Sequence, residues 1–118
     1  MFEHVDLNLP PIKRETIDGV RYYSVPDEDE LIKLVSITSI TSHYNKQIFL
    51  DWRKRVGVEE ANRITKKATA RGTDFHEAAQ NYLLNLELNW DDYQPTTKYM
   101  FHHATPYLDK INNIHAIE

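Results

Sequence analysis

One stretch, Asp51 to Leu86, constrains the fold of this 118-residue chain more than any other. It is the longest helix-prone segment, and its apolar residues recur at the three-to-four spacing of an amphipathic helix. Gly72 interrupts the pattern, and glycine commonly ends a helix. Thr73 follows it and is a favourable N-cap for a new helix. The pattern therefore predicts two helices that meet at Gly72, with His76 in the first turn of the second.

Shorter patterns predict the remaining elements. Two strand-like runs flank Asp18-Gly19, a dipeptide typical of a tight hairpin turn. Pro26 and the acidic run Asp27–Glu30 are expected to end this hairpin, as a solvated loop or a helix start. An irregular lead-in is expected over residues 1–13, followed by strands over 13–17 and 20–25 and a β-branched segment over 34–38. Four helices are expected: from Thr41 or Ser42 to about Val56, over 58–71, over about 74–86, and from Pro95 or Thr96 to about Asn112. A strand is expected to open at 114–118.

Two apolar stripes predict which helix faces are buried. In the first helix the stripe comprises Tyr44, Ile48 and Trp52 with Phe49 or Leu50. In the helix after Gly72 it comprises Phe75, Ala79, Tyr82 and Leu86. We expect both stripes to face the core. Pro106 lies within the last predicted helix and should kink or split it.

Composition places the chain among globular proteins, with 41% hydrophobic and 27% charged residues. No apolar run approaches the roughly 20 residues of a membrane span, and the N-terminus lacks the order of a signal peptide. The absence of cysteine excludes disulfides and thiolate metal sites and favours an intracellular location. The net charge is −4, so a nucleic-acid partner has to be argued from local charge.

Local charge is strongly positive between Arg53 and Arg71, where seven basic side chains stand against Glu59 and Glu60, a local net charge of +5. The basic residues are Arg53, Lys54, Arg55, Arg63, Lys66, Lys67 and Arg71. Arg63, Lys66 or Lys67, and Arg71 recur at a spacing of three to four, so they share a helix face. Such a concentration is typical of surfaces that bind the DNA phosphate backbone. The alternative is a solvated face that merely covers the core.

His76 is the first candidate for a catalytic or metal-binding residue, although a histidine beside an apolar stripe can equally be a core residue. The segment 76–80 is not a zinc protease motif, because Gln80 stands where the second histidine would be needed. His102 and His103 are adjacent, so on a helix they diverge and are expected to be ordinary surface or half-buried residues. Three glycines in total exclude the glycine-rich phosphate-binding motifs.

The block from Trp52 to His76 resembles the RecB-type exonucleases of the PD-(D/E)XK superfamily. The matching residues are Trp52-Arg53-Lys54-Arg55-Val56-Gly57, Glu59 to Thr65, and Ala70-Arg71-Gly72-Thr73 with His76. The likeness is greatest to the branch of the mitochondrial genome maintenance exonuclease and its phage and bacterial relatives. Upstream, residues 35–38 resemble that branch's Ser-Val-Thr segment, and downstream, residues 116–118 resemble its Val-Glu strand start.

The resemblance implies an α/β restriction-endonuclease-like core, to which this chain would supply the mainly helical N-terminal part and a short β-hairpin. It also implies exonucleolytic hydrolysis of DNA phosphodiester bonds with Mg²⁺ or Mn²⁺. His76 would be the catalytic residue that helps to hold the metal, since hard cations otherwise take oxygen ligands. The family's next aspartate and its Asp-x-Lys pair have no counterpart before Glu118. We therefore expect no ion bound to this chain alone and no DNA cleavage by it.

This reading divides the chain into an N-terminal extension with a hairpin, residues 1–35, and a helical nuclease portion, residues 36–118. The expected partners are DNA and a second chain or segment that carries the missing catalytic half; no membrane partner is expected. The alternative is a non-catalytic helical DNA-binding or regulatory module, and a third possibility is a helical domain without a nucleic-acid role.

Overall fold

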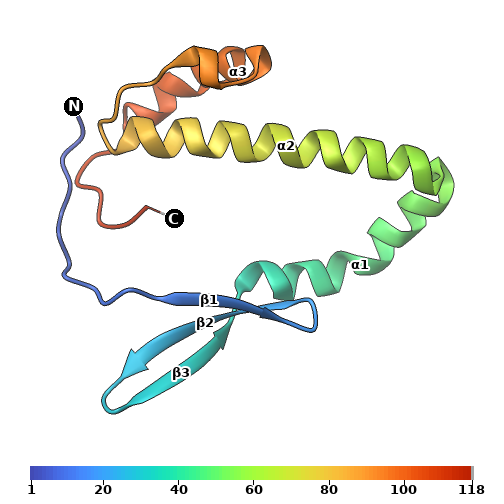
Figure 1. The fold of residues 1–118 in the computed structure, drawn as a ribbon, viewed down its shortest axis with the longest axis horizontal. Helices are drawn as coiled ribbons and strands as arrows, with labels where there is room; N and C mark the ends of the chain where they lie inside the picture. Colours follow the sequence, from blue (N-terminus) through green and yellow to red (C-terminus); the bar gives the residue numbers. More distant parts are fainter. Residues whose placement is uncertain (118) are drawn as a thin grey trace. The chain divides into compact units, whose positions relative to one another are not determined.

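The computed structural model describes residues 1–117, which form a three-stranded antiparallel sheet followed by three helices (Figure 1). The chain divides into two compact units. The sheet unit is Asn8–Val58, and the helical unit is Met1–Leu7 together with the chain from Glu59 on. The elements in order are β1 (Lys13–Ile17), β2 (Val20–Asp27), β3 (Glu30–Val35), α1 (Ile37–Val56), α2 (Val58–Leu83), the 3₁₀ helix η1 (Trp90–Asp92) and α3 (Pro95–Leu108).

The first hairpin matches the sequence prediction. β1 pairs with β2 from Lys13↔Ser24 to Ile17↔Val20, and the strands are joined by a two-residue turn. Asp18 and Gly19 have φ angles of 50° and 78°. A tight hairpin turn needs such left-handed conformations, which aspartate and glycine adopt more easily than most residues.

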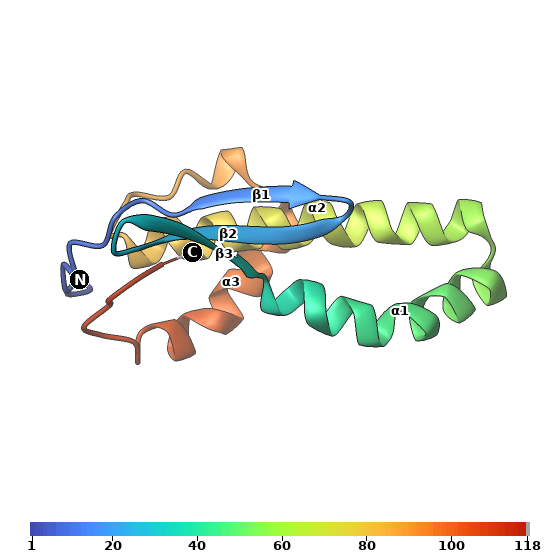
Figure 2. The ribbon, with the colours of Figure 1, turned by 90° about the horizontal axis from the view of Figure 1, so that it is seen from below.

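The acidic run is exposed and turns the chain, as predicted for a solvated loop, but strand pairing continues after it. Asp27 and Glu30 pair with each other, and Glu28 takes a φ of 49° in the turn between β2 and β3. The run is therefore the tip of a second hairpin, and the three strands lie side by side in the order β1-β2-β3 (Figure 2). Pro26 is tolerated within β2 because β1 pairs only as far as Ser24, which leaves Pro26 with a strand on one side only.

Helix α1 begins earlier than predicted. It starts at Ile37, directly after β3, with Ser36 as the N-cap residue rather than Thr41 or Ser42. The Ser36 carbonyl accepts hydrogen bonds from the backbone N–H groups of Ser39 and Ile40. The Ser36 side chain makes no cap hydrogen bond and is instead hydrogen-bonded to the Thr38 hydroxyl at 2.7 Å. The predicted end of α1 is confirmed, because Gly57 at φ 93° closes the helix after Val56.

The predicted core face of α1 is exposed. Tyr44 is 80% exposed and Ile48 71% exposed, and no residue of α1 is buried. Trp52 alone in the stripe is half-buried. A three-to-four spacing shows that a helix has an apolar face, but it does not show which surface covers that face.

The predicted helix break at Gly72 is wrong. Helix α2 runs without interruption over 26 residues, and Thr73 caps nothing because it lies inside the helix. Gly72 costs a helix interior about 1 kcal/mol relative to alanine. That penalty is too small to end a helix whose flanking turns are otherwise favourable. Glu59 and Glu60 lie in the first turn of α2, where the helix dipole favours negative charge.

The core of the helical unit forms around the C-terminal half of α2. Phe101 of α3 is buried, and its ring lies 5.1 Å from that of Tyr82 and 5.0 Å from that of Trp90. The Phe2 ring also lies 5.1 Å from that of Tyr82, in an edge-to-face arrangement. Aromatic pairs favour such tilted and edge-to-face geometries. Within α2, Ala61 and Ala78 are fully buried, whereas Leu86 of the predicted stripe lies beyond the helix and is exposed.

Two predictions near the end of the chain need correction. Helix α3 starts at Pro95 as expected but ends at Leu108, and Pro106 lies in its final turn rather than splitting it. Pro106 has no N–H to donate to the His102 carbonyl, so α3 lacks that one hydrogen bond but continues for two more residues. Asn113 turns the chain at φ 52°, but Ile114 forms only an isolated parallel bridge with His4, and residues 115–117 form no strand. Glu118 lies outside the described residues.

Candidate nucleic-acid interface

The seven basic residues of the run fall on two helices in two units. Arg53, Lys54 and Arg55 form the last turn of α1 in the sheet unit. The other four lie in the N-terminal half of α2 in the helical unit: Arg63, Lys66, Lys67 and Arg71. Each group is therefore described within its own unit.

The three basic residues at the end of α1 can stabilise that helix. Basic side chains in the last turn of a helix interact favourably with the helix dipole. Arg53 is half-buried, and its guanidinium lies 5.8 Å from the centre of the Phe49 ring, within reach of a cation–π contact. Lys54 and Arg55 are exposed. Of the three, Lys54 and Arg55 are the more accessible to a phosphate.

The group on α2 is split by an ion pair. Arg63 makes a two-pronged contact with Glu60, with Nε donating to Oε2 at 2.9 Å and Nη2 donating to Oε1 at 2.5 Å. These hydrogen bonds lower the pKa of Glu60 and raise that of Arg63. Arg63 is thereby paired with an exposed carboxylate of opposite charge. Neither Lys66, Lys67 nor Arg71 forms an ion pair within residues 1–117, and all three are exposed.

His76 lies well inside α2 and not in a first turn, because the helix begins at Val58. Its side chain is exposed, and the nearest ring is that of the adjacent Phe75, at 6.4 Å. The core alternative for His76 is therefore wrong in this structure. A metal-binding His76 should point toward the region of Glu118, and that residue lies outside the described residues.

The uninterrupted α2 sets the angle between His76 and the basic group. Lys67 precedes His76 by nine residues, which is two and a half turns at 3.6 residues per turn. The two side chains therefore leave the helix on opposite faces. Lys66 is ten residues away, so it leaves α2 closer to the His76 face than Lys67 does.

No three histidine, aspartate or glutamate side chains within residues 1–117 come together where a metal ion could be held. Mg²⁺ and Mn²⁺ prefer several oxygen ligands, and one imidazole does not meet that preference. The described residues therefore do not fit a complete Mg²⁺ or Mn²⁺ site, and we assign no catalytic step to them.

The adjacent histidines of α3 are surface residues, as predicted. His102 and His103 are both exposed, and their rings lie against different partners. The His102 ring is 6.1 Å from that of Trp90, and the His103 ring is 4.6 Å from that of Tyr99. They cannot act as a chelating pair.

Sequence reasoning missed one cluster of polar and basic side chains, which lines an open hollow of the sheet unit. On α1 the cluster follows helical spacing: Ser39, Ser42, His43 and Lys46. That spacing was available in the sequence. The cluster was not recognised because α1 was expected to begin at Thr41 or Ser42, which left Ser39 outside the helix.

Comparisons with protein-family models, with curated proteins and with solved structures find no match to this chain. The likeness to the RecB-type exonucleases therefore depends on the quoted residues alone. None of the helices in the described part of the chain combines the length and apolar character needed to cross a membrane.

Proposed function

We propose that this chain binds DNA through the exposed basic face of α2, as the N-terminal part of a metal-dependent exonuclease of the RecB type. The observation that carries the proposal is the display of Lys66, Lys67 and Arg71 without intramolecular ion pairs among the described residues. A cation that is already paired contributes little when a phosphate arrives, whereas an unpaired one releases counterions from DNA.

The spacing of these three residues suits a backbone contact. Lys67 and Arg71 are four residues apart, so they leave α2 on one face and can contact neighbouring phosphates, with Lys66 about 100° to the side of Lys67. Lysine binds phosphate as a point charge, and arginine does so through a planar fork. Neither reads base edges from such a position, so binding should depend little on DNA sequence.

The nuclease part of the proposal depends on the resemblance. In it, the chain belongs to a restriction-endonuclease-like α/β core, and exposed His76 contributes one ligand to a Mg²⁺ or Mn²⁺ site whose other ligands are carboxylates. A second chain or segment would supply those carboxylates. Exposure of His76 supports this role, because a metal ligand needs access to the ion.

The second candidate is a non-catalytic helical DNA-binding or regulatory module. One observation favours it: the basic face of α2 is complete within this chain, whereas a metal site is not formed by the described residues. DNA binding is common to both candidates, so it is tested first.

The experiment replaces Lys66 and Lys67 together by glutamate and measures binding to a fluorescent DNA duplex and to a single strand by anisotropy. The matched control is the Lys98→Glu/Lys110→Glu chain, which carries the same change of net charge on exposed residues C-terminal to α2. We expect the α2 variant to lose at least tenfold in affinity on every sequence, and the control to bind nearly as the parent does.

Salt dependence completes the test. The logarithm of the binding constant should fall with the logarithm of salt concentration by about 0.9 for each phosphate contacted. The α2 variant should show a shallower slope by about two contacts. If both variants lose affinity equally, net charge alone decides binding; if neither does, the basic face is only solvated. Either result contradicts the proposal.

A further inference from the structure

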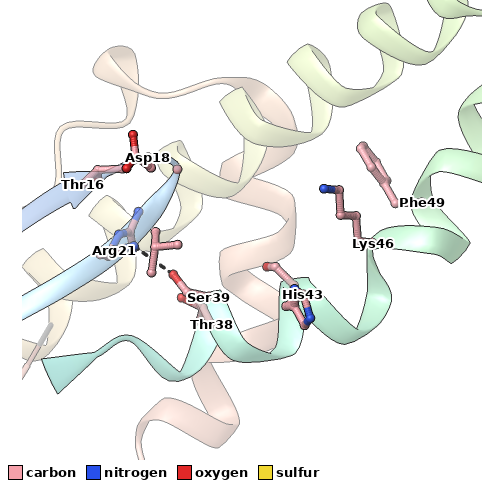
Figure 3. Close-up of a pocket in the computed structure, with 11 residues that line it drawn as sticks. Thr16, Asp18, Arg21, Thr38, Ser39, His43, Lys46 and Phe49 are labelled. Atoms are coloured by element: carbon pink, nitrogen blue, oxygen red, sulfur yellow. Dashed lines mark hydrogen bonds between the residues drawn. The ribbon is translucent and has the colours of Figure 1, made fainter.

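The sheet unit contains an open hollow of about 770 Å³ between the β1–β2 turn and the first turns of α1 (Figure 3). One face of α1 lines it with residues three or four apart: Ser39, Ser42, His43, Lys46 and Phe49. The turn and the adjoining strands contribute Thr16, Asp18, Gly19, Val20 and Arg21, and Thr38 completes the lining. None of these residues belongs to the basic run of α2.

Two hydrogen bonds fasten the two sides of the hollow together. The Arg21 backbone N–H donates to the Ser39 hydroxyl at 3.0 Å. The Ser36 backbone N–H donates to the Arg21 carbonyl at 2.8 Å. Arg21 is therefore held at a set position relative to the start of α1, and the hollow does not depend on how the two units are arranged.

The lining is rich in donors for an anion. Arg21 and Lys46 lie on either side of the hollow, and the Lys46 ammonium group points toward the β1–β2 turn (Figure 3). Neither side chain forms an ion pair within residues 1–117. Four hydroxyl groups add further donors: Thr16, Thr38, Ser39 and Ser42. An arginine, a lysine and several hydroxyls are the side chains that most often bind phosphate oxygens.

Asp18 is the one carboxylate in the lining, and it opposes an anion. Its presence has a conformational reason, because Asp18 takes a φ of 50° in the hairpin turn. Aspartate and asparagine tolerate that left-handed conformation better than most residues. Asparagine could thus replace Asp18 with little effect on the turn while removing its charge.

We infer that this hollow binds a phosphate group between Arg21 and Lys46. The inference goes beyond DNA binding by α2, since it uses other residues in another unit. Thr38 and Ser39 lie in the first turn of α1, where the positive end of the helix dipole favours an anion. The phosphate could be a monoester, as in a nucleotide or a 5′-phosphorylated strand end, or a phosphodiester of a nucleic-acid backbone.

The test uses the full chain with Lys66→Glu and Lys67→Glu, so that the basic face of α2 does not contribute. Backbone amide signals of Arg21, Ser39 and Ser42 are followed by NMR during titration with inorganic phosphate, with adenosine monophosphate and with an unphosphorylated oligonucleotide. Sodium chloride at matched ionic strength is the reference. We expect saturable shifts at these three amides with at least one phosphate compound and none with chloride.

Variants then assign the binding to named side chains. Arg21→Gln and Lys46→Gln should each weaken it about tenfold, as loss of one charge-assisted hydrogen bond predicts. Lys13→Gln removes an equal charge from an exposed position of β1 outside the hollow and should change nothing. Asp18→Asn should tighten binding, a gain that partial unfolding could not produce.

The outcomes of the titration distinguish the two possible kinds of phosphate and show which results would overturn the inference. Saturation by the monoesters alone assigns the hollow to terminal or free phosphate, and saturation by the unphosphorylated oligonucleotide assigns it to the backbone. If no phosphate compound saturates, or if Lys13→Gln weakens binding as much as Arg21→Gln does, the inference is overturned. Because α2 is already charge-reversed in this chain, that failure would leave DNA binding by α2 undecided and separately testable.

Discussion

Lys67 and His76 lie on opposite faces of α2, two and a half turns apart on one uninterrupted helix. A DNA backbone that runs along the Lys67 face is therefore not beside the His76 ring. If His76 contributes to a metal site, DNA has to reach it around the helix, and Lys66 is better placed than Lys67 to contact that part of the strand. Backbone binding and any metal role of His76 are accordingly separable by substitution.

The first prediction follows from this separation. His76→Ala should leave DNA affinity within about twofold of the parent, since no phosphate contact is lost, whereas Lys67→Glu should reduce it severalfold. Fluorescence anisotropy with one duplex at one salt concentration measures both. Equal losses in the two variants would show that His76 lies in the DNA path, contrary to the helix geometry.

The second prediction concerns Gly72. A Cβ atom added there would meet no atom within 4 Å, and Gly72 lies in the middle of α2. Gly72→Ala should therefore stabilise the chain by roughly 0.5–1 kcal/mol in urea unfolding, because alanine is the better helix former and restricts the unfolded chain.

Gly57 provides the matched control for Gly72. It has equal space around a Cβ atom but a φ of 93°, which strains any other residue. Gly57→Ala should destabilise the chain. Stabilisation by both substitutions would mean that conformational strain at Gly57 has no energetic weight, and destabilisation by both would contradict the uninterrupted α2.

The third prediction tests the junction of α2 and α3. The Asp74 carboxylate accepts hydrogen bonds from the fully buried Thr97 hydroxyl and, at 2.9 Å, from the Gln94 backbone N–H at the start of α3. Asp74→Ala leaves both donors without their partner and should cost about 2 kcal/mol in chemical denaturation. Asp74→Asn keeps an acceptor oxygen and should cost less. Equal costs would show that charge, and not hydrogen bonding, holds the junction.

The fourth prediction concerns pH. The Tyr82 hydroxyl donates to Asp109 Oδ1 at 2.5 Å, and this hydrogen bond, followed by desolvation, raises the pKa of Tyr82 above 10.0. A raised folded-state pKa stabilises the fold below pH 10 and loses that contribution as the pH rises through the raised value. Tyr82→Phe should cost about 1 kcal/mol at neutral pH and progressively less in strong alkali.

Phenolate absorbance provides the readout for Tyr82. The difference between the parent and Tyr82→Phe titrations isolates one tyrosine, which should ionise above pH 10. Asp109→Asn should lower the pKa of this tyrosine toward 10. If the tyrosine identified by this difference as Tyr82 ionises in the parent with a pKa at or below 10, the hydrogen bond between Tyr82 and Asp109 is contradicted.

Sequence patterns predicted the structure correctly where a short segment determines its own backbone conformation. Asp18-Gly19 predicted the first hairpin, Gly57 predicted the end of α1, and Pro95 predicted the start of α3, because turns, C-caps and N-terminal prolines depend on backbone preferences of a few residues. Predictions that relied on one residue to end an element failed where the flanking residues favoured continuing it. Gly72 and Pro26 were each expected to end an element, and each lies within one.

The sequence by itself determined the charged and apolar faces of the helices and the hairpin turn, since periodicity and turn chemistry are properties of neighbouring residues. Only the tertiary structure decided which apolar faces are covered: Phe101 is buried against Tyr82 and Trp90, while Tyr44 stands 80% exposed. It also decided that α2 is one helix, which separates Lys67 from His76, and that Arg21 meets the first turns of α1. The covered faces and the position of Arg21 are relations between segments distant along the chain, and they depend on packing and hydrogen bonds that no local pattern encodes.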